Sequence, residues 1–184
     1  ALKQARHAGA RERPGSGSLA DAMARTPRMN RPPAAQLRHA LRQRVIYADT
    51  DQMGFVYHGT YTRFLEAARV ELMRSLGHTY AEAEAQGYGM PLTDLAISYI
   101  APARYDDLLS VHVGVAELSY ARLRFGYQVC VEPGDREGLQ ERLTVLFAET
   151  CHCCIQLADG RPTRFPDDLR ATFASFAPQP PSSD

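Results

Sequence analysis

The sequence predicts an α+β domain in which one curved antiparallel sheet wraps around a single long helix. Three observations support this fold class. Apolar residues recur every three or four positions over residues 58–76, which is the period of a helix with one buried face. After Gly89 the period changes to two, and four further segments alternate as strands do. The turns between those segments are short, which favours an antiparallel meander against which the helix must pack.

The first half of the chain is expected to hold one strand and the long helix. Residues 40–48 form the strand, with Val45 and Tyr47 on one face. Residues 49–57 form a loop, and the helix then spans residues 58–76. The loop, which carries two aspartates, therefore leads directly into the start of the long helix.

The second half is expected to consist of strands between two short helices, which are predicted over residues 80–87 and 166–176. The alternating apolar residues mark strands around residues 95–99, 111–115, 123–131 and 143–157. Alternation in the last of these slips near Ala148, which predicts a bulge.

With 184 residues the chain is expected to form one folded domain, which we place at residues 37–176. Residues 1–36 lack a sustained apolar period and are predicted to be a disordered extension, and residues 177–184 a tail. Eight of the 21 Lys/Arg residues but only two of the 21 Asp/Glu residues precede position 39. The remaining 13 basic and 19 acidic residues make the domain acidic, which argues against nucleic acid as a partner.

The sequence also argues against a transmembrane helix and against a metal site. No run of about 18 apolar residues occurs. Three of the four cysteines lie in Cys151-His152-Cys153-Cys154, but alternation along a strand would place Cys151 and Cys153 on one face and the other two residues on the opposite face. We therefore expect free thiols and no metal. In the absence of a secretory signal, we expect a reducing cytoplasm.

Asp51 is the residue most suited to catalysis. It follows a strand and precedes the turn at Gly54, a few residues before the helix. The first N–H groups of a helix lack partners and carry partial positive charge, so they could polarise a carbonyl whose carbon then faces the Asp51 carboxylate. That carboxylate could act as nucleophile or as general base for water. Spacing alone also allows a purely structural role, in which Asp51 caps the helix or closes an Asx turn.

Neighbouring polar residues offer alternatives. Asp49 could share the face of Asp51 and raise the pKa of one of the two carboxyls, or it could simply hydrogen-bond within the loop. His58 could be a base, a substrate contact or a solvated residue at the helix start. Glu66 and Glu71 lie on the helix and could serve as the base, although most helix glutamates face solvent.

Two further groups are candidates for substrate binding. Tyr57 and Tyr61 are suited to line the core or a pocket. Arginines near predicted strand ends or turns could hold the phosphates of coenzyme A through paired hydrogen bonds, or could be ordinary surface charge. They are Arg104, Arg122, Arg124, Arg161 and Arg164. Among them we assign Arg122 and Arg124 to substrate binding.

One motif resembles a known family. The pattern Asp49-Thr50-Asp51-x-x-Gly54-x-Val56-Tyr57-His58-x-x-Tyr61-x-x-Phe64 is similar to the signature of the 4-hydroxybenzoyl-CoA thioesterase family. Its Tyr-His pair is most similar to the tol-pal-associated acyl-CoA thioesterases. Residues 97–107 and 159–166 also resemble that family, and the similarity spans roughly residues 40–172.

The resemblance implies the hotdog fold, an antiparallel sheet around a long central helix. It implies that Asp51 is the catalytic carboxylate, that a backbone N–H near His58 polarises the thioester, and that Gly54, Val56, Tyr57 and Tyr61 belong to the substrate site. It further implies a homodimer or homotetramer with each site built across a subunit interface, and no metal or prosthetic group. Coenzyme A would enter only as part of the substrate.

These expectations lead to a first hypothesis and two alternatives. The first is an acyl-CoA thioesterase that releases free acid and coenzyme A through Asp51. The second is a hotdog enoyl-CoA hydratase or dehydratase with His58 as its base. The third is a non-enzymatic protein that binds acyl-carrier substrates. The sequence leaves open the preferred acyl chain, the choice between nucleophile and general base, and the choice between dimer and tetramer.

Overall fold

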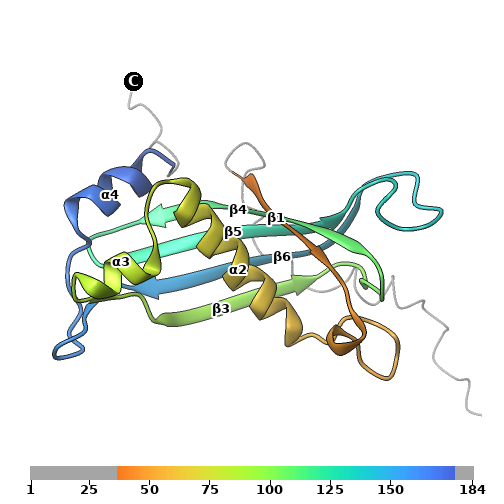
Figure 1. The fold of residues 1–184 in the computed structure, drawn as a ribbon, viewed down its shortest axis with the longest axis horizontal. Helices are drawn as coiled ribbons and strands as arrows, with labels where there is room; N and C mark the ends of the chain where they lie inside the picture. Colours follow the sequence, from red (N-terminus) through yellow and green to blue (C-terminus); the bar gives the residue numbers. More distant parts are fainter. Residues whose placement is uncertain (1–36, 177–184) are drawn as a thin grey trace, which may run out of the picture.

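The computed structural model describes residues 37–176, in which five antiparallel strands wrap around one long helix (Figure 1). In sheet order the strands are β1 (Arg38–Arg44), β4 (Leu108–Leu118), β5 (Arg122–Val131), β6 (Leu143–Cys153) and β3 (Leu92–Tyr99). The long helix is α2 (Thr60–Ser75), which crosses one face of the sheet. The smaller elements are a 3₁₀ turn (Tyr47–Asp49), α3 (Tyr80–Ala85), β2 (Tyr88–Gly89), β7 (Ile155–Gln156) and α4 (Asp167–Ala174). The predicted architecture is confirmed.

Helix α2 is held by its apolar stripe rather than by capping. Its buried side chains recur at helical spacing and are Tyr61, Phe64, Leu65, Ala68, Leu72 and Met73. Phe64 and Leu65 are only 2% and 1% exposed, and burying a side chain of this size stabilises a fold by about 1.5–3 kcal/mol. The helix ends where Gly77 adopts a φ of +84°, a conformation that glycine accepts without steric cost.

The face of the sheet that contacts α2 is made by alternate residues of the central strands. Val111, Val113 and Val115 of β4 and Phe125 and Tyr127 of β5 are all 0% exposed and belong to one apolar cluster with the helix. The intervening residues point to the opposite side, which we call the outer face of the sheet. This alternation confirms the period-two reading of the sequence.

The first strand is shorter than predicted. It ends at Arg44, and the chain then turns through the 3₁₀ segment instead of extending to residue 48. The turn forms because the Asp49 carboxylate accepts a hydrogen bond from the N–H of Ile46 at 3.0 Å. Val45 is consequently buried while Tyr47 is 75% exposed, so the prediction that these two residues share a face was wrong.

The segment predicted as one last strand, residues 143–157, forms two strands in the structure. β6 ends at Cys153, and the next residues form β7, which pairs with β2 in a separate two-stranded sheet. The bulge lies at Val145, where the register against β5 skips a residue, rather than near Ala148. Apolar residues continue to alternate on both sides of the boundary between β6 and β7, so the local pattern could not reveal where β6 ends.

The cysteine cluster follows the expected alternation. His152 and Cys154 are 1% and 0% exposed, whereas Cys151 and Cys153 are partly exposed on the outer face. The predicted extension over residues 1–36 and the tail over residues 177–184 lie outside the described residues. Within residues 37–176, no helix is long and apolar enough to cross a lipid bilayer.

Candidate active site

The loop before α2 is folded back on itself at Asp51. The N–H of Asp51 donates to the carbonyl of Phe55 at 2.8 Å, and the N–H of Gly54 donates to the carbonyl of Asp51 at 2.9 Å. Gly54 has a φ of +76°, which only glycine adopts without strain in such a turn. Gly54 therefore shapes the loop, and its own atoms do not line the pocket described below.

A second segment holds this loop in place. The N–H of Val56 donates to the carbonyl of Ala103 at 2.9 Å, and Phe55 forms an isolated bridge with Arg104. The N–H of Tyr57 donates to the carbonyl of Asp49 at 2.8 Å. The loop is thus fixed by backbone hydrogen bonds both internally and to residues 103–104, which gives Asp51 a defined position.

The Asp51 carboxylate is only partly engaged. Its Oδ1 accepts the N–H of Met53 at 2.9 Å, which is the Asx turn considered from the sequence. Among residues 37–176, no hydrogen-bond donor contacts its Oδ2. Asp51 does not cap the helix, because the N-cap of α2 is Gly59 and no side chain caps it. One oxygen positions the carboxylate and the other is available for chemistry.

The start of α2 presents unpaired backbone donors beside this carboxylate. Within the described part of the chain, the N–H groups of His58 and Gly59 have no hydrogen-bond acceptor. The hydroxyl of Tyr99 donates to the carbonyl of His58 at 3.1 Å. Because C=O and N–H of a trans peptide point in opposite directions, this bond turns the N–H of Gly59 away from Tyr99. Donors of this kind at a helix start favour a developing negative charge.

Asp51 and His58 both line an open pocket of about 250 Å³. Its lining residues are Asp51, Met53, Phe55, Val56, His58, Tyr61, Tyr99, Ala101 and Pro102. The lining is largely apolar with one carboxylate and one histidine, as is common for sites that bind an organic substrate. Burial raises the pKa of Tyr61 far above its usual value, so its hydroxyl stays protonated and cannot act as a base.

The other predicted site residues lie elsewhere. Tyr57 is exposed, and its ring packs against the ring of His58 with centroids 4.2 Å apart. Asp49 does not share the pocket with Asp51. It is 0% exposed, accepts the N–H of Ile46, and pairs with Arg63 at 3.3 Å. Asp49 thus has the loop-bonding role that was its alternative.

Arg122 and Arg124 are not near Asp51 within one chain. They begin β5, beside Cys151 and Cys153 of β6, whereas the pocket adjoins Tyr99 at the far end of β3. Between those ends β3 runs for about 20 Å at the usual rise per residue. Arg124 contacts Glu117 at 3.2 Å and Glu149 at 4.0 Å. A single protomer does not bring these arginines to the carboxylate.

A second cavity of about 330 Å³ lies farther along α2. It is lined by Thr62, Leu65, Glu66, Arg69, Leu92, Leu95, Tyr127, Thr150 and His152. Arg69 Nη1 is buried without a hydrogen-bond partner among the described residues, and burial lowers the pKa of this guanidinium. Sequence reasoning missed Arg69, although its place next to Ala68 in the buried stripe was a usable signal. Glu66, an alternative base, belongs to this cavity and not to the Asp51 pocket.

Thiol chemistry is disfavoured in both cavities. Burial raises the pKa of Cys130 to about 12 and that of Cys154 to about 11, so both thiols stay protonated at neutral pH. Neither cysteine lines either cavity. A carboxylate is therefore the better candidate for attack on a carbonyl.

His152, which lines the second cavity, leads to a prediction about how stability depends on pH. His152 contacts Thr150 Oγ1 at 3.0 Å and the carbonyl of Met90 at 3.2 Å. Burial, followed by the charge of Arg69, lowers the pKa of His152 to about 4. Between that value and the unfolded pKa of about 6.5, only the unfolded chain binds the proton. Unfolding free energy should therefore fall as pH drops through this window, by on the order of 3 kcal/mol from this residue.

Urea unfolding at several pH values between 4 and 8 measures this effect. Other groups titrate in the same range, so the comparison is with His152→Gln, which keeps a neutral hydrogen-bonding side chain. The native protein should lose more stability than the variant as pH falls, and the two should run parallel above pH 7. Parallel curves throughout the window would contradict the assignment.

Comparison with known proteins identifies the family. Residues 45–173 match the profile of the thioesterase-like superfamily. The chain belongs to this superfamily. Membership in this superfamily confirms the prediction that the protein is a thioester hydrolase. A relative in Haemophilus influenzae, named acyl-CoA thioesterase YbgC, is 34% identical over 71% of this chain and 90% of its own length. The putative acyl-CoA thioesterase YneP of Bacillus subtilis is 31% identical over 66% of this chain and 82% of its own.

Solved structures of superfamily members confirm the hotdog fold. A hypothetical protein from Thermus thermophilus superposes with a TM-score of 0.66 at 34% identity, covering 76% of this chain and 99% of its own. The DHNA-CoA thioesterase from Staphylococcus aureus superposes with a TM-score of 0.66 at 28% identity, covering 73% of this chain and 87% of its own.

Proposed function

We propose that this thioesterase hydrolyses an acyl-CoA to the free acid and coenzyme A, with Asp51 as its catalytic carboxylate. The observation that carries the proposal is that one pocket is lined both by Asp51, which has an unengaged carboxylate oxygen, and by His58, whose N–H has no acceptor among the described residues. The names of the relatives in Haemophilus influenzae and Bacillus subtilis supply the acyl-CoA class.

The chemistry follows from this arrangement. The thioester oxygen accepts a hydrogen bond from the N–H of His58, which stabilises the negative charge that forms when the carbonyl carbon is attacked. In the general-base route, Asp51 takes a proton from water, the water oxygen bonds to the carbon, and the carbon–sulfur bond breaks. Asp51 then returns the proton to the departing thiolate. In the nucleophilic route, Asp51 bonds to the carbon and the carbon–sulfur bond breaks, which releases the coenzyme A thiolate. Water then cleaves the resulting anhydride, so that Asp51 is restored as a carboxylate and the released proton goes to the thiolate.

A second copy of the chain is proposed to complete the site. Within residues 37–176, strand β3 pairs only with β6, so it is an edge of the described sheet, and its Leu92 and Leu95 are 52% and 36% exposed. An exposed apolar edge of this length favours pairing with another chain. A homodimer or homotetramer would cover this edge and place further residues near the pocket, including arginines that a single protomer keeps distant. A cytoplasmic location stays a prediction.

Thiol release from a panel of short, long and aromatic acyl-CoA substrates tests the proposed activity. At least one substrate should give free coenzyme A at a rate proportional to enzyme. Hydration of an enoyl-CoA without thiol release would instead identify a hydratase. Tight binding of an acyl-carrier substrate, with no turnover of any thioester, would identify a binding protein and overturn the proposal.

A further inference from the structure

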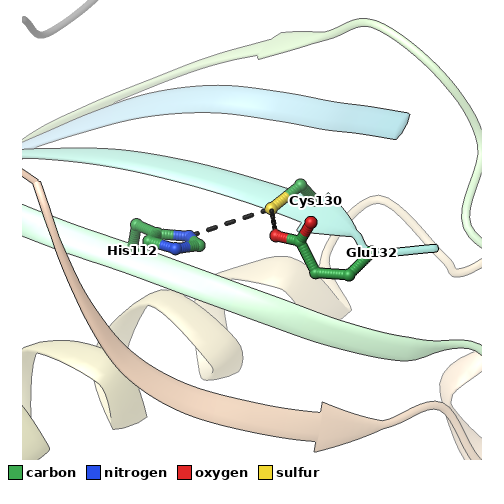
Figure 2. Close-up of side chains that lie close together, drawn as sticks. All are labelled: His112, Cys130 and Glu132. Carbon is green, nitrogen blue, oxygen red and sulfur yellow. Dashed lines mark hydrogen bonds between the residues drawn. The ribbon is translucent and has the colours of Figure 1, made fainter. Parts of the chain in front are cut away.

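A cluster of three side chains of metal-ligating types lies on the outer face of the sheet (Figure 2), and none of the three lines the Asp51 pocket. His112 comes from β4, Cys130 from β5, and Glu132 from the residue just after β5. The thiol of Cys130 lies 3.8 Å from His112 Nδ1 and 3.4 Å from Glu132 Oε1. All three ligand atoms lie within 4.8 Å of one another.

The strand register explains why these residues meet. Cys130 pairs with Ser110 and His112 pairs with Gln128, so Cys130 and His112 are diagonal neighbours on one face of the β4–β5 ladder. Glu132 follows Cys130 by two positions and returns to the same face. Because β5 ends at Val131, the Glu132 side chain can turn back over the thiol.

The separations match the ligand shell of a tetrahedral zinc ion. With zinc–sulfur bonds of about 2.3 Å and zinc–nitrogen or zinc–oxygen bonds of about 2.0–2.2 Å, tetrahedral angles place the ligand atoms about 3.5 Å apart. The two distances from the Cys130 sulfur lie on either side of that value. Thiolate, imidazole and carboxylate are also the three ligand types that zinc prefers. Little rearrangement of the three side chains would be needed.

We propose that His112, Cys130 and Glu132 bind a zinc ion, with a water molecule as the fourth ligand. On binding the ion, the Cys130 thiol releases its proton to solvent. The resulting thiolate and the Glu132 carboxylate together supply two negative charges, which balance the charge of the ion. Cys130 is 0% exposed, while His112 and Glu132 are partly exposed, so the sulfur lies at the floor of the site and solvent reaches the other two ligands.

Arg142 competes with the ion. Its Nε and Nη2 donate to Glu132 Oε1 at 2.8 and 2.5 Å, and Nη2 lies 3.5 Å from His112 Nε2. A neutral imidazole that binds zinc through Nδ1 carries its proton on Nε2, which then cannot accept from Arg142. Metal binding therefore requires this half-exposed guanidinium to leave the histidine. Removing it should strengthen zinc binding.

Titration of the full-length, metal-free protein with zinc, in competition with a chromogenic chelator, measures the affinity. Cobalt in place of zinc reports the sulfur ligand through its thiolate charge-transfer absorption. We expect the native protein to bind one ion per chain. Cys130→Ser should lose the charge-transfer absorption, and its zinc affinity should fall by at least about 100-fold. Substituting a residue that only supports a metal ligand typically lowers metal affinity by about 10–100-fold, so a larger fall indicates a direct ligand. The matched control Cys153→Ser, on the same face but outside the cluster, should bind as the native protein does.

Two surface variants make the test independent of the buried cysteine. Glu132→Gln should weaken zinc binding, whereas Arg142→Ala should strengthen it several-fold, although both remove a partner from the same ion pair. Circular dichroism of each metal-free variant controls for folding. Absence of zinc binding in the native protein, persistence of the cobalt absorption in Cys130→Ser, or weaker binding in Arg142→Ala would each overturn the proposal.

Discussion

Replacing Asp51 with asparagine should lower kcat for thioester hydrolysis by about 1,000-fold or more while the fold survives. Asparagine is nearly isosteric, and its amide oxygen can still accept the N–H of Met53 that holds the Asx turn. The amide cannot take a proton from water or attack a carbonyl, and loss of a positioned acid–base group typically costs about 10²–10⁴ in rate. The measurement is steady-state thiol release together with the thermal midpoint of unfolding.

Neighbouring carboxyls provide the controls. Asp49→Asn should reduce stability through the lost pairing with Arg63 and the weakened bond from Ile46, with a smaller direct effect on the chemical step. Glu66→Gln should leave turnover within about 10-fold of the native value, because Glu66 lines the second cavity and not the Asp51 pocket. Near-native turnover in the Asp51 variant, together with a large loss in Glu66→Gln, would move the reaction to the second cavity.

His58 separates a main-chain role from a side-chain role. His58→Ala removes the imidazole but keeps the N–H groups at the start of α2, so kcat should fall far less than in Asp51→Asn. A comparable loss in both variants would assign the imidazole a direct part in the reaction. The pH profile of kcat would then distinguish a histidine base from a carboxylate.

Replacing Asp107 with alanine should destabilise the fold by about 3–5 kcal/mol, the cost of leaving one partner of a buried ion pair alone. Asp107 is 2% exposed and accepts hydrogen bonds from Arg136 Nε at 2.7 Å and from the N–H of Arg104 at 2.7 Å. Arg136 also donates to the carbonyl of Pro102 at 3.0 Å. The pair thus holds the segment that lines the Asp51 pocket and receives the Val56 N–H.

Urea unfolding monitored by circular dichroism measures this loss, and the exposed pair of Glu71 and Arg74 is the matched comparison. Those side chains are 47% and 56% exposed and lie 3.9 Å apart on α2. Glu71→Ala should change the unfolding free energy by less than about 0.5 kcal/mol. Equal losses in the two variants would show that burial does not decide the strength of the Asp107 pair.

Local patterns in the sequence determined much of this protein. The change of period from 3.6 to 2 identified α2 and the strands, because burial on one face repeats at the spacing of each element. The position of Asp51 just before the long helix predicts a carboxylate near unpaired N–H groups, because every helix start leaves its first donors unsatisfied, and the catalytic role of Asp51 stays a prediction. The family motif added the fold and the reaction class.

Only the tertiary structure decided which side chains share a site. Asp49 and Asp51 are two residues apart, yet one is buried against Arg63 and the other enters the pocket, because hydrogen bonds to Ile46 and Phe55 bend the chain between them. The helical period could place Arg69 near the buried stripe, but the cavity that it faces is completed by residues of β3, β5 and β6, which that period does not reveal. His112, Cys130 and Glu132 meet through strand register. Register depends on bonds between distant segments, and a local pattern carries no information about which distant segments pair.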